Sequence, residues 1–321
     1  MGEIAVRQAI LHGLIAAGLV DAALRAWRVR RAQSRIAFWL LALAFPFLVL
    51  PAFLIAAPFR GTDAFTAGWA LFSIDRWNAV RVAGAGADTI AFGALALVGT
   101  LLLLRDVVPL LVETARDRRR GGAACVPAPD GLVALVAEIA GRAATPVPAI
   151  TVLRTDASVM FVRGVFHPTL VLSDRVLSRL SDREGVAAVV HELAHIRFRD
   201  PLAGWLLIAA RVLMFWNPAV QLVGRALVEE MEHRADGVAA RLAGASAFAT
   251  ALRTLTPGSG RDGLPSDNRP PARVGLASRL HQAHLRARLA ALTQVQPALP
   301  LVGTRFAVLA VTLTAILFFV V

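Results

Sequence analysis

One short motif constrains this chain more than any other feature: His191 and His195 flank Glu192 in the sequence His-Glu-Leu-Ala-His. On an α-helix, residues four apart lie on the same face, so the two imidazoles can converge on one ion. Imidazole is a common ligand of Zn²⁺, and a catalytic zinc site keeps one coordination position for water. A glutamate beside that water can take its proton as the water attacks a carbonyl group. The motif therefore predicts a metal site for amide hydrolysis, with Glu192 as the general base.

The residues before the motif favour a helix. Residues 181–184, Ser-Asp-Arg-Glu, form a typical N-cap and acidic first turn. Apolar residues then follow at near-helical spacing: Val186, Val189 and Val190. By chance, the five-residue pattern occurs in about one chain in a hundred of this length, so it needs supporting context. The competing interpretation is an ordinary amphipathic helix with two surface histidines, and a third ligand would argue against it.

The third ligand is expected in a second polar cluster, residues 229–236, which read Glu-Glu-Met-Glu-His-Arg-Ala-Asp in an otherwise apolar region. Because Glu232 and Asp236 are four apart, a helix turns both carboxylates the same way. We expect Glu232 to bind the metal and Asp236 to orient a ligand imidazole through its free N–H. His233 is a competing ligand, but a helix points it away from Asp236. Alternatively, the glutamates of the cluster form a solvated helix face paired with nearby arginines.

The composition indicates an integral membrane protein. Apolar residues make up 57% of the chain, the mean hydropathy is +0.62, and the apolar residues are clustered rather than spread. The formal net charge of +12 does not indicate nucleic-acid binding, because the arginines flank apolar segments and set the topology. The single cysteine, Cys125, cannot form an internal disulfide, and we interpret it as an inert free thiol.

Four apolar segments are candidate membrane spans: residues 4–24, 36–57, 83–104 and 306–321. The second has no charged residue and is long enough to cross a hydrocarbon core of about 30 Å. Its two prolines, Pro46 and Pro51, predict kinks. A signal peptide fits the first segment less well, because Glu3 precedes the first arginine and no clear cleavage site follows.

The distribution of arginine predicts the orientation. Five arginines separate the first two spans and four follow the third, whereas the loop between the second and third spans has three arginines diluted by Asp63 and Asp75. Segments rich in arginine face the cytoplasm. We therefore expect the N-terminus outside the cell, and residues 116–305, which include the predicted metal site, inside it.

Residues 203–224 are apolar enough to be a span, yet they separate Glu232 from the two histidines. A single crossing would put these ligands on opposite sides of the membrane. We therefore expect a helical hairpin with its turn at residues 217–218, Asn-Pro, packed at the membrane surface. A buried helix within the catalytic domain is the alternative.

Short β-branched runs before the motif predict strands at residues 150–153, 160–162 and 169–172. An edge strand can hold a substrate by main-chain pairing, and either of the last two runs is a candidate. It is equally consistent that these runs are only sheet core. Residues 257–271 read as a linker, and residues 279–292 as a basic helix that could lie on anionic headgroups.

The two polar motifs together resemble the zinc signature of the gluzincin membrane peptidases, in which an HExxH helix is followed by an ExxxD helix. Two related groups share it: the HtpX and CAAX-prenyl endopeptidases of metallopeptidase family 48, and the BlaR/MecR antirepressor sensors of family 56. Residues 164–172 and 215–218 favour family 56, because they resemble its Gly-hydrophobic-x-x-Pro-hydrophobic-Leu strand and its aromatic-Asn/His-Pro turn. Those sensors end in a large extracellular penicillin-binding domain, and because this sequence stops at Val321, we do not expect β-lactam sensing.

The spans and the resemblance imply a predominantly α-helical polytopic membrane protein with a small α+β zincin-like catalytic domain. We expect a membrane domain with three spans at 1–113, and a cytoplasmic zinc metallopeptidase domain that includes the apolar hairpin at 114–256. A linker and basic helix at 257–303 and a C-terminal transmembrane helix at 304–321 would follow.

The resemblance implies a zinc metalloendopeptidase in a bacterial inner membrane, with one zinc per chain held by His191, His195 and Glu232. Glu192 would be the base, and Asp236 would orient a ligand. The expected activity is regulated cleavage of a cytoplasmic or membrane protein, for example a transcriptional repressor. One alternative is HtpX-like quality control of membrane proteins. The other is a non-catalytic signalling scaffold with a structural zinc, although a structural site has no use for the base Glu192.

Overall fold

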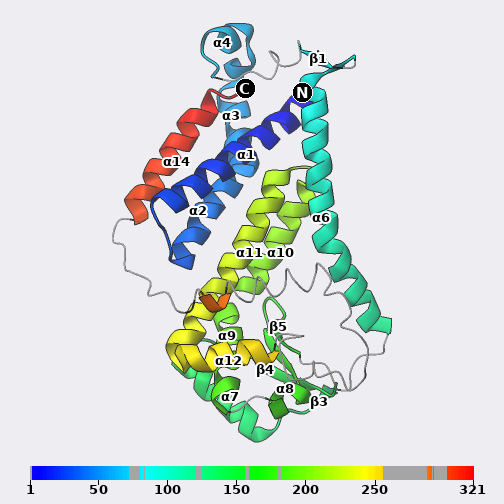
Figure 1. Cartoon of the computed structure of the whole chain (residues 1–321), viewed down its shortest axis with the longest axis vertical. Coiled ribbons are helices and arrows are strands. Elements are labelled where there is room, and N and C mark those ends of the chain that lie inside the picture. Colours follow the sequence, from blue (N-terminus) through cyan, green and yellow to red (C-terminus); the bar gives the residue numbers. More distant parts are fainter. Residues whose placement is uncertain are drawn as a thin grey trace, which may run out of the picture. The chain divides into compact units, whose positions relative to one another are not determined.

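A computed structural model describes residues 2–71, 80–82, 84–119, 125–155, 159–179, 182–255, 288–290, 292 and 302–321 (Figure 1). The chain divides into two compact units. The membrane unit comprises Met1–Ala115, Leu206–Glu230 and Pro297–Val321, and the sheet unit comprises Arg116–Trp205 and Met231–Gln296. In this division the hairpin is shared between the two units, whereas the predicted catalytic domain, 114–256, included all of it.

The membrane unit is built from helices: α1 (Gly2–Ala26), α2 (Ala32–Ala44), α3 (Leu50–Ala56), α4 (Asp63–Gly68), α6 (Ala87–Arg119) and α14 (Val302–Phe318). Three stretches are long and apolar enough to cross a membrane: Ala5–Ala26, Ala32–Ala56 and Ala87–Asp106. They correspond to the first three predicted spans, and the fourth prediction corresponds to a shorter apolar helix, Gly303–Phe318. A π-helical turn at Phe45–Val49 joins α2 to α3. It contains Pro46, whose ring cannot fit a regular helix interior, as expected for a kink.

The predicted hairpin forms from α10 (Asp200–Leu213) and α11 (Pro218–Ala239). Asn217 begins α11, because its Oδ1 accepts hydrogen bonds from the backbone N–H of Ala219 at 3.0 Å and of Val220 at 3.4 Å, and Pro218 suits the first helical position. Its Nδ2 donates to the carbonyl of Ala9 on α1 at 2.9 Å. The tip thus packs against α1, which contains a candidate span.

A glycine on α6, Gly99, permits a second close contact at the hairpin tip. A Cβ at Gly99 on α6 would lie 2.7 Å from the carbonyl carbon of Trp216, far inside van der Waals contact. The main chain of the hairpin turn therefore rests directly on α6. Two more contacts on this helix are ionic: Asp106 pairs with both Arg211 of α10 and Arg225 of α11. Paired charges of this kind are the usual form in which ionised groups occur among apolar spans.

Within its described residues, the sheet unit has four strands, β3 (Cys125–Val126), β4 (Ala149–Leu153), β5 (Met160–Arg163) and β6 (Thr169–Ser173). Their order is β3-β4-β6-β5, with β4 and β6 parallel and the other pairs antiparallel. The three predicted strands are therefore confirmed. Since β6 lies between β4 and β5, the prediction that 169–172 could be an edge strand is wrong, whereas β5 is at an edge.

The sheet unit includes the helices α7 (Asp130–Arg142), α8 (Asp174–Arg179), α9 (Asp182–Arg197) and α12 (Ala245–Leu255). A π-helical turn at Ala240–Gly244 joins α11 to α12. One apolar core lies among α7, α9, α12 and the sheet, and its buried members include Val136, Ile139, Leu170, Leu172, Val190, Leu193, Ala194, Val238 and Phe248. Burial of Val190, Leu193 and Ala194 fixes the rotation of α9 about its axis. It therefore also fixes the direction in which the histidines of the motif point.

Candidate metal centre

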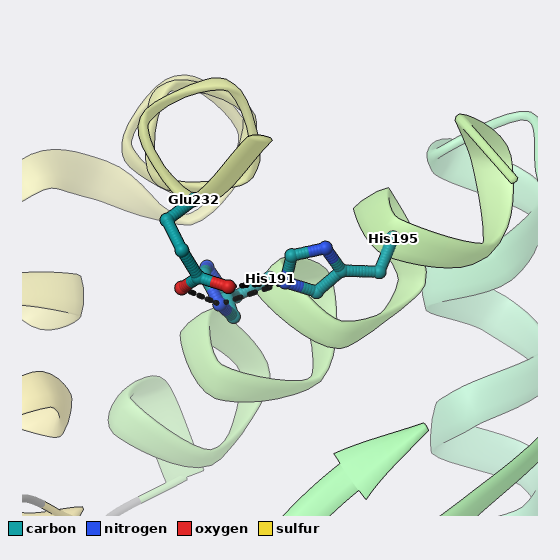
Figure 2. Close-up of side chains that lie close together, drawn as sticks. All are labelled: His191, His195 and Glu232. Carbon is teal, nitrogen blue, oxygen red and sulfur yellow. Dashed lines mark hydrogen bonds and ion pairs between the residues drawn. The ribbon is translucent and has the colours of Figure 1, made fainter. Parts of the chain in front are cut away.

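Helix α9 presents His191 and His195 one turn apart, as the spacing predicts. Their Nε2 atoms lie 3.2 Å apart. Glu232 approaches from α11, with its Oε2 3.7 Å from Nε2 of His191 and its Oε1 3.6 Å from Nε2 of His195 (Figure 2). Ligands about 2.0–2.1 Å from a tetrahedral zinc lie about 3.3 Å from one another. The structure therefore brings these three predicted residues together in an arrangement that fits zinc.

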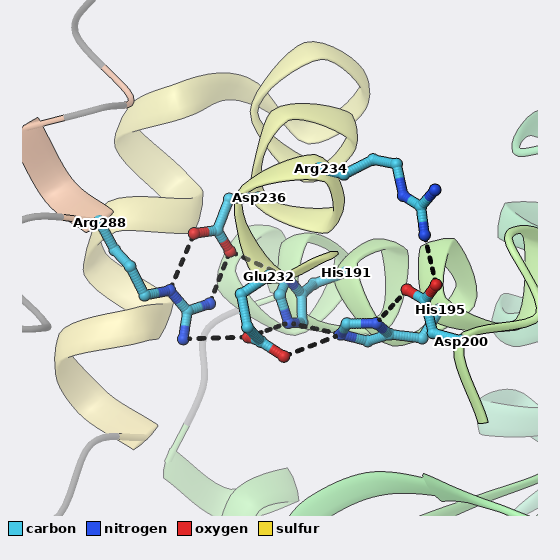
Figure 3. A network of polar contacts seen from close by, with 7 residues as sticks. All are labelled: His191, His195, Asp200, Glu232, Arg234, Asp236 and Arg288. Atoms are coloured by element: carbon cyan, nitrogen blue, oxygen red, sulfur yellow. Dashed lines mark hydrogen bonds and ion pairs between the residues drawn. The ribbon is translucent and has the colours of Figure 1, made fainter. Parts of the chain in front are cut away.

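Each imidazole also meets a carboxylate at its other ring nitrogen. Asp236 Oδ1 lies 3.1 Å from Nδ1 of His191, and Asp200 Oδ2 lies 2.8 Å from Nδ1 of His195 (Figure 3). Both aspartates are buried. A carboxylate in this position holds the proton on Nδ1 and leaves Nε2 free to bind a metal. The sequence predicted this position for Asp236 but not for Asp200, whose only signal was an acidic residue just after the motif helix.

A guanidinium group in turn neutralises each aspartate. Arg288 binds Asp236 with two nitrogens, at 2.8 Å from Nε to Oδ2 and 2.5 Å from Nη2 to Oδ1. Arg234 forms an ion pair with Asp200, and its guanidinium carbon lies 4.0 Å from the ring centroid of Phe198. The site therefore contains two similar chains of contacts, each running from an arginine through an aspartate to a histidine (Figure 3).

The surroundings of the site shift the pKa values of several groups. Burial raises the pKa of Glu192, and the positive charges of the two histidines and Arg288 lower it only in part. Burial would lower the pKa of His195, but the hydrogen bond with Asp200 and the charge of Glu232 raise it by more. A glutamate whose pKa is raised suits a residue that both takes up and releases a proton. These shifts therefore fit Glu192 as an acid–base group.

The aspartate behind His191 is shifted in the opposite direction. Burial would raise the pKa of Asp236, but the 3.1 Å contact with Nδ1 of His191 and the hydrogen bonds from Arg288 outweigh it, so the pKa of this carboxyl is lowered. Asp236 is therefore ionised and able to hold the His191 ring. Phe248 of α12 fixes the same ring from its face, with the two rings stacked at 5.3 Å between centroids and 22° between planes.

The competing interpretations of residues 229–236 can now be compared with the structure. Among the described residues, the group able to hold a metal comprises His191, His195 and Glu232 and does not include His233. Glu230 forms an ion pair with Arg35 of α2. The arginines proposed as partners for a solvated glutamate face are engaged with aspartates instead, Arg225 with Asp106 and Arg234 with Asp200. These contacts support the metal-site interpretation over the solvated-face alternative.

Comparisons with known proteins found similarity to membrane metallopeptidases. Residues 134–246 match the family model described as BlaR1 peptidase M56. A protease HtpX homolog from Desulforapulum autotrophicum is 33% identical over 76 residues, which are 23% of this chain and 25% of the relative. The chain thus matches only a quarter of the length of that curated protein. The expected resemblance to membrane metallopeptidases of the M56 and M48-related kind is confirmed.

A search of solved structures found the crystal structure of S. mikatae Ste24p. The two chains are 16% identical, with 87% of this chain and 80% of that chain covered and a TM-score of 0.37.

Proposed function

We propose that this protein is a zinc-dependent membrane endopeptidase. The observation that carries the proposal is the convergence of His191, His195 and Glu232, whose ligand atoms all lie within 4.8 Å of one another. The motif residue Glu192 follows His191 directly, and its carboxyl interacts electrostatically with all three residues. Two imidazoles, a carboxylate and an adjacent base are the groups that zinc-dependent amide hydrolysis needs.

The residues of the chain have separate roles in the proposed reaction. His191, His195 and Glu232 would hold the zinc ion, which would supply a bound water whose pKa is lowered to about 7. The Glu192 carboxylate accepts a proton from the attacking water and then donates it to the nitrogen of the leaving amine. Asp236 and Asp200 keep the two imidazoles in the tautomer with Nε2 free. The proton therefore passes from water to product through one carboxyl group.

We propose that β5 binds the substrate. Among the described residues it is an edge strand, and it pairs there with β6 alone. Its other side offers main-chain groups to an extended peptide, a mode of binding that selects for chain segments without fixed structure. The substrate class is therefore a protein with an accessible extended segment.

The M56 match favours regulated cleavage of a cytoplasmic protein, for example a transcriptional repressor. The HtpX match favours a second candidate, removal of damaged membrane proteins. The distribution of arginine supports a location in the inner membrane with the sheet unit in the cytoplasm. A purely structural zinc site is disfavoured, because it would not need an acid–base group such as Glu192.

Proteolysis of an unfolded reporter tests the proposal. The purified full chain in detergent should cleave fluorescently labelled casein, lose this activity with 1,10-phenanthroline, and regain it when zinc is added. The His191→Ala variant should neither retain zinc nor cleave casein. Cleavage that survives both the chelator and the substitution would mean that the metal centre is not the catalytic site.

A further inference from the structure

Arg288 is distant in sequence from the rest of the metal centre. It lies 52 positions after Asp236 and outside the residues that match the peptidase family model. The sequence placed it on a basic helix that could contact lipid headgroups. The structure corrects this for Arg288, because its side chain is only 13% exposed and its guanidinium lies against carboxylates of α11 (Figure 3).

We propose that Arg288 is a positioning residue that holds the third metal ligand, Glu232, and the His191 partner, Asp236, in one geometry. The proposal rests on the metal site inferred above. Nη1 of Arg288 lies 3.3 Å from Oε2 of Glu232, while Nε and Nη2 bind the two oxygens of Asp236. One planar group therefore contacts both a proposed ligand and the carboxylate that orients another.

The charges of α11 show why such a group is needed. Glu232 and Asp236 are four residues apart, so their carboxylates lie on the same helix face and repel each other. Asp236 is buried and Glu232 partly so, with side-chain exposures of 3% and 29%, so water screens this repulsion poorly. The guanidinium of Arg288 neutralises the pair. Without it, the carboxylate of Glu232 is free to rotate away from the histidines.

The second arginine of the site provides an internal comparison. Arg234 forms an ion pair with Asp200, the aspartate behind His195, much as Arg288 pairs with Asp236 behind His191. Arg288 also contacts the proposed ligand Glu232 itself. Its loss should therefore disturb both the ligand and the orienting carboxylate, whereas a lysine would restore the charge but not two parallel hydrogen bonds.

The test measures metal binding rather than activity. Zinc affinity would be determined by competition with a chromophoric chelator for the full chain in detergent and for Arg288→Ala and Arg288→Lys. The visible spectrum of the Co²⁺-substituted proteins would report the ligand geometry. Arg183→Ala is the matched control, because it removes an exposed arginine from α9. We expect affinity to fall about 10- to 100-fold in Arg288→Ala, by analogy with other residues that orient ligands.

Arg288→Lys should bind zinc more tightly than Arg288→Ala and less tightly than the wild type, and both variants should have altered Co²⁺ spectra. Zinc affinity and Co²⁺ spectra equal to the wild type in both variants would overturn the proposal. If Arg288→Ala does not fold, the lysine variant decides by the same two measurements. The His191→Ala variant distinguishes failure of this proposal from failure of the proposed metal site. If His191→Ala loses zinc while the Arg288 variants bind it like the wild type, only the role of Arg288 is rejected. If His191→Ala retains zinc, the metal site itself is rejected.

Discussion

The carboxylate of Asp200 lies 2.8 Å from Nδ1 of His195, although the helix that carries His195 ends between them. Arg199 makes this contact possible, because its left-handed backbone, with φ of 56°, turns the chain so that Asp200 faces back toward α9. Asp200 therefore fixes the tautomer of one proposed ligand from the first residue of the next helix.

Asp200→Ala should weaken zinc binding about 10- to 100-fold, because His195 loses the group that holds its proton on Nδ1. Chelator competition on the purified protein measures this change. Asp130→Ala, which removes an exposed aspartate at the start of α7, is the control. Equal zinc affinities in the two variants would show that the contact between Asp200 and His195 has no role in metal binding.

The residues of α11 should differ in their effect on the metal. Glu232→Ala should remove a ligand and abolish stoichiometric zinc, and Asp236→Ala should reduce affinity about 10- to 100-fold. His233→Ala should retain zinc. Metal analysis after dialysis ranks the three variants. If His233 proves indispensable and Glu232 dispensable, the site has three histidine ligands and the gluzincin assignment is wrong.

Gly99→Ala should destabilise the hairpin, because the new Cβ would lie 2.7 Å from the main chain of Trp216. Gly93→Ala on the same helix is a matched control, since nothing lies within 4 Å of a Cβ there. Alanine also favours a helix by about 1 kcal/mol over glycine, so the control should be neutral or stabilising. Thermal unfolding in detergent compares them, and an equal melting temperature for the two variants would contradict the described contact.

Topology follows from the need for all three ligands to meet at one ion. Cysteines at Arg183, on the motif helix, and at Glu229, on α11, are both exposed positions, and Cys125→Ser removes the native thiol. We expect both to be labelled only by reagents that enter the cytoplasm. Labelling of one position from outside the cell would mean that the segment between them crosses the membrane once. Glu232 would then lie on the opposite side from the histidines.

The parts of the site that the sequence predicted are those governed by local periodicity. The spacing of His191 and His195, and of Glu232 and Asp236, specifies a common helix face without any knowledge of the fold. Asp200 escaped prediction because its position depends on the backbone turn at Arg199. The role of Arg288 was not predicted, because its contact with Asp236, 52 positions away, depends on tertiary packing and not on a local sequence pattern.

The same distinction applies to the fold. The β-branched runs identified three strands. They did not predict that β4 pairs in parallel with β6, because this pairing depends on contacts between distant residues. As a result, β5 lies at the edge of the sheet, although it comes between β4 and β6 in the sequence. Likewise, Asn217 and Pro218 predicted the turn of the hairpin. The packing of this turn against α6 depends on Gly99, because the absence of a side chain there lets the main chain of the turn come close. A single glycine in an apolar helix does not predict such a contact.

The substitution Glu192→Gln tests the central claim most directly, because it removes the proton acceptor while keeping the size of the side chain. Zinc content and cleavage of labelled casein would be measured on the same preparation of wild-type and variant protein. We predict that the variant keeps about one zinc per chain and loses proteolysis, since Glu192 moves a proton and does not bind the metal. Loss of zinc in parallel with activity, or full activity in the variant, would contradict this account.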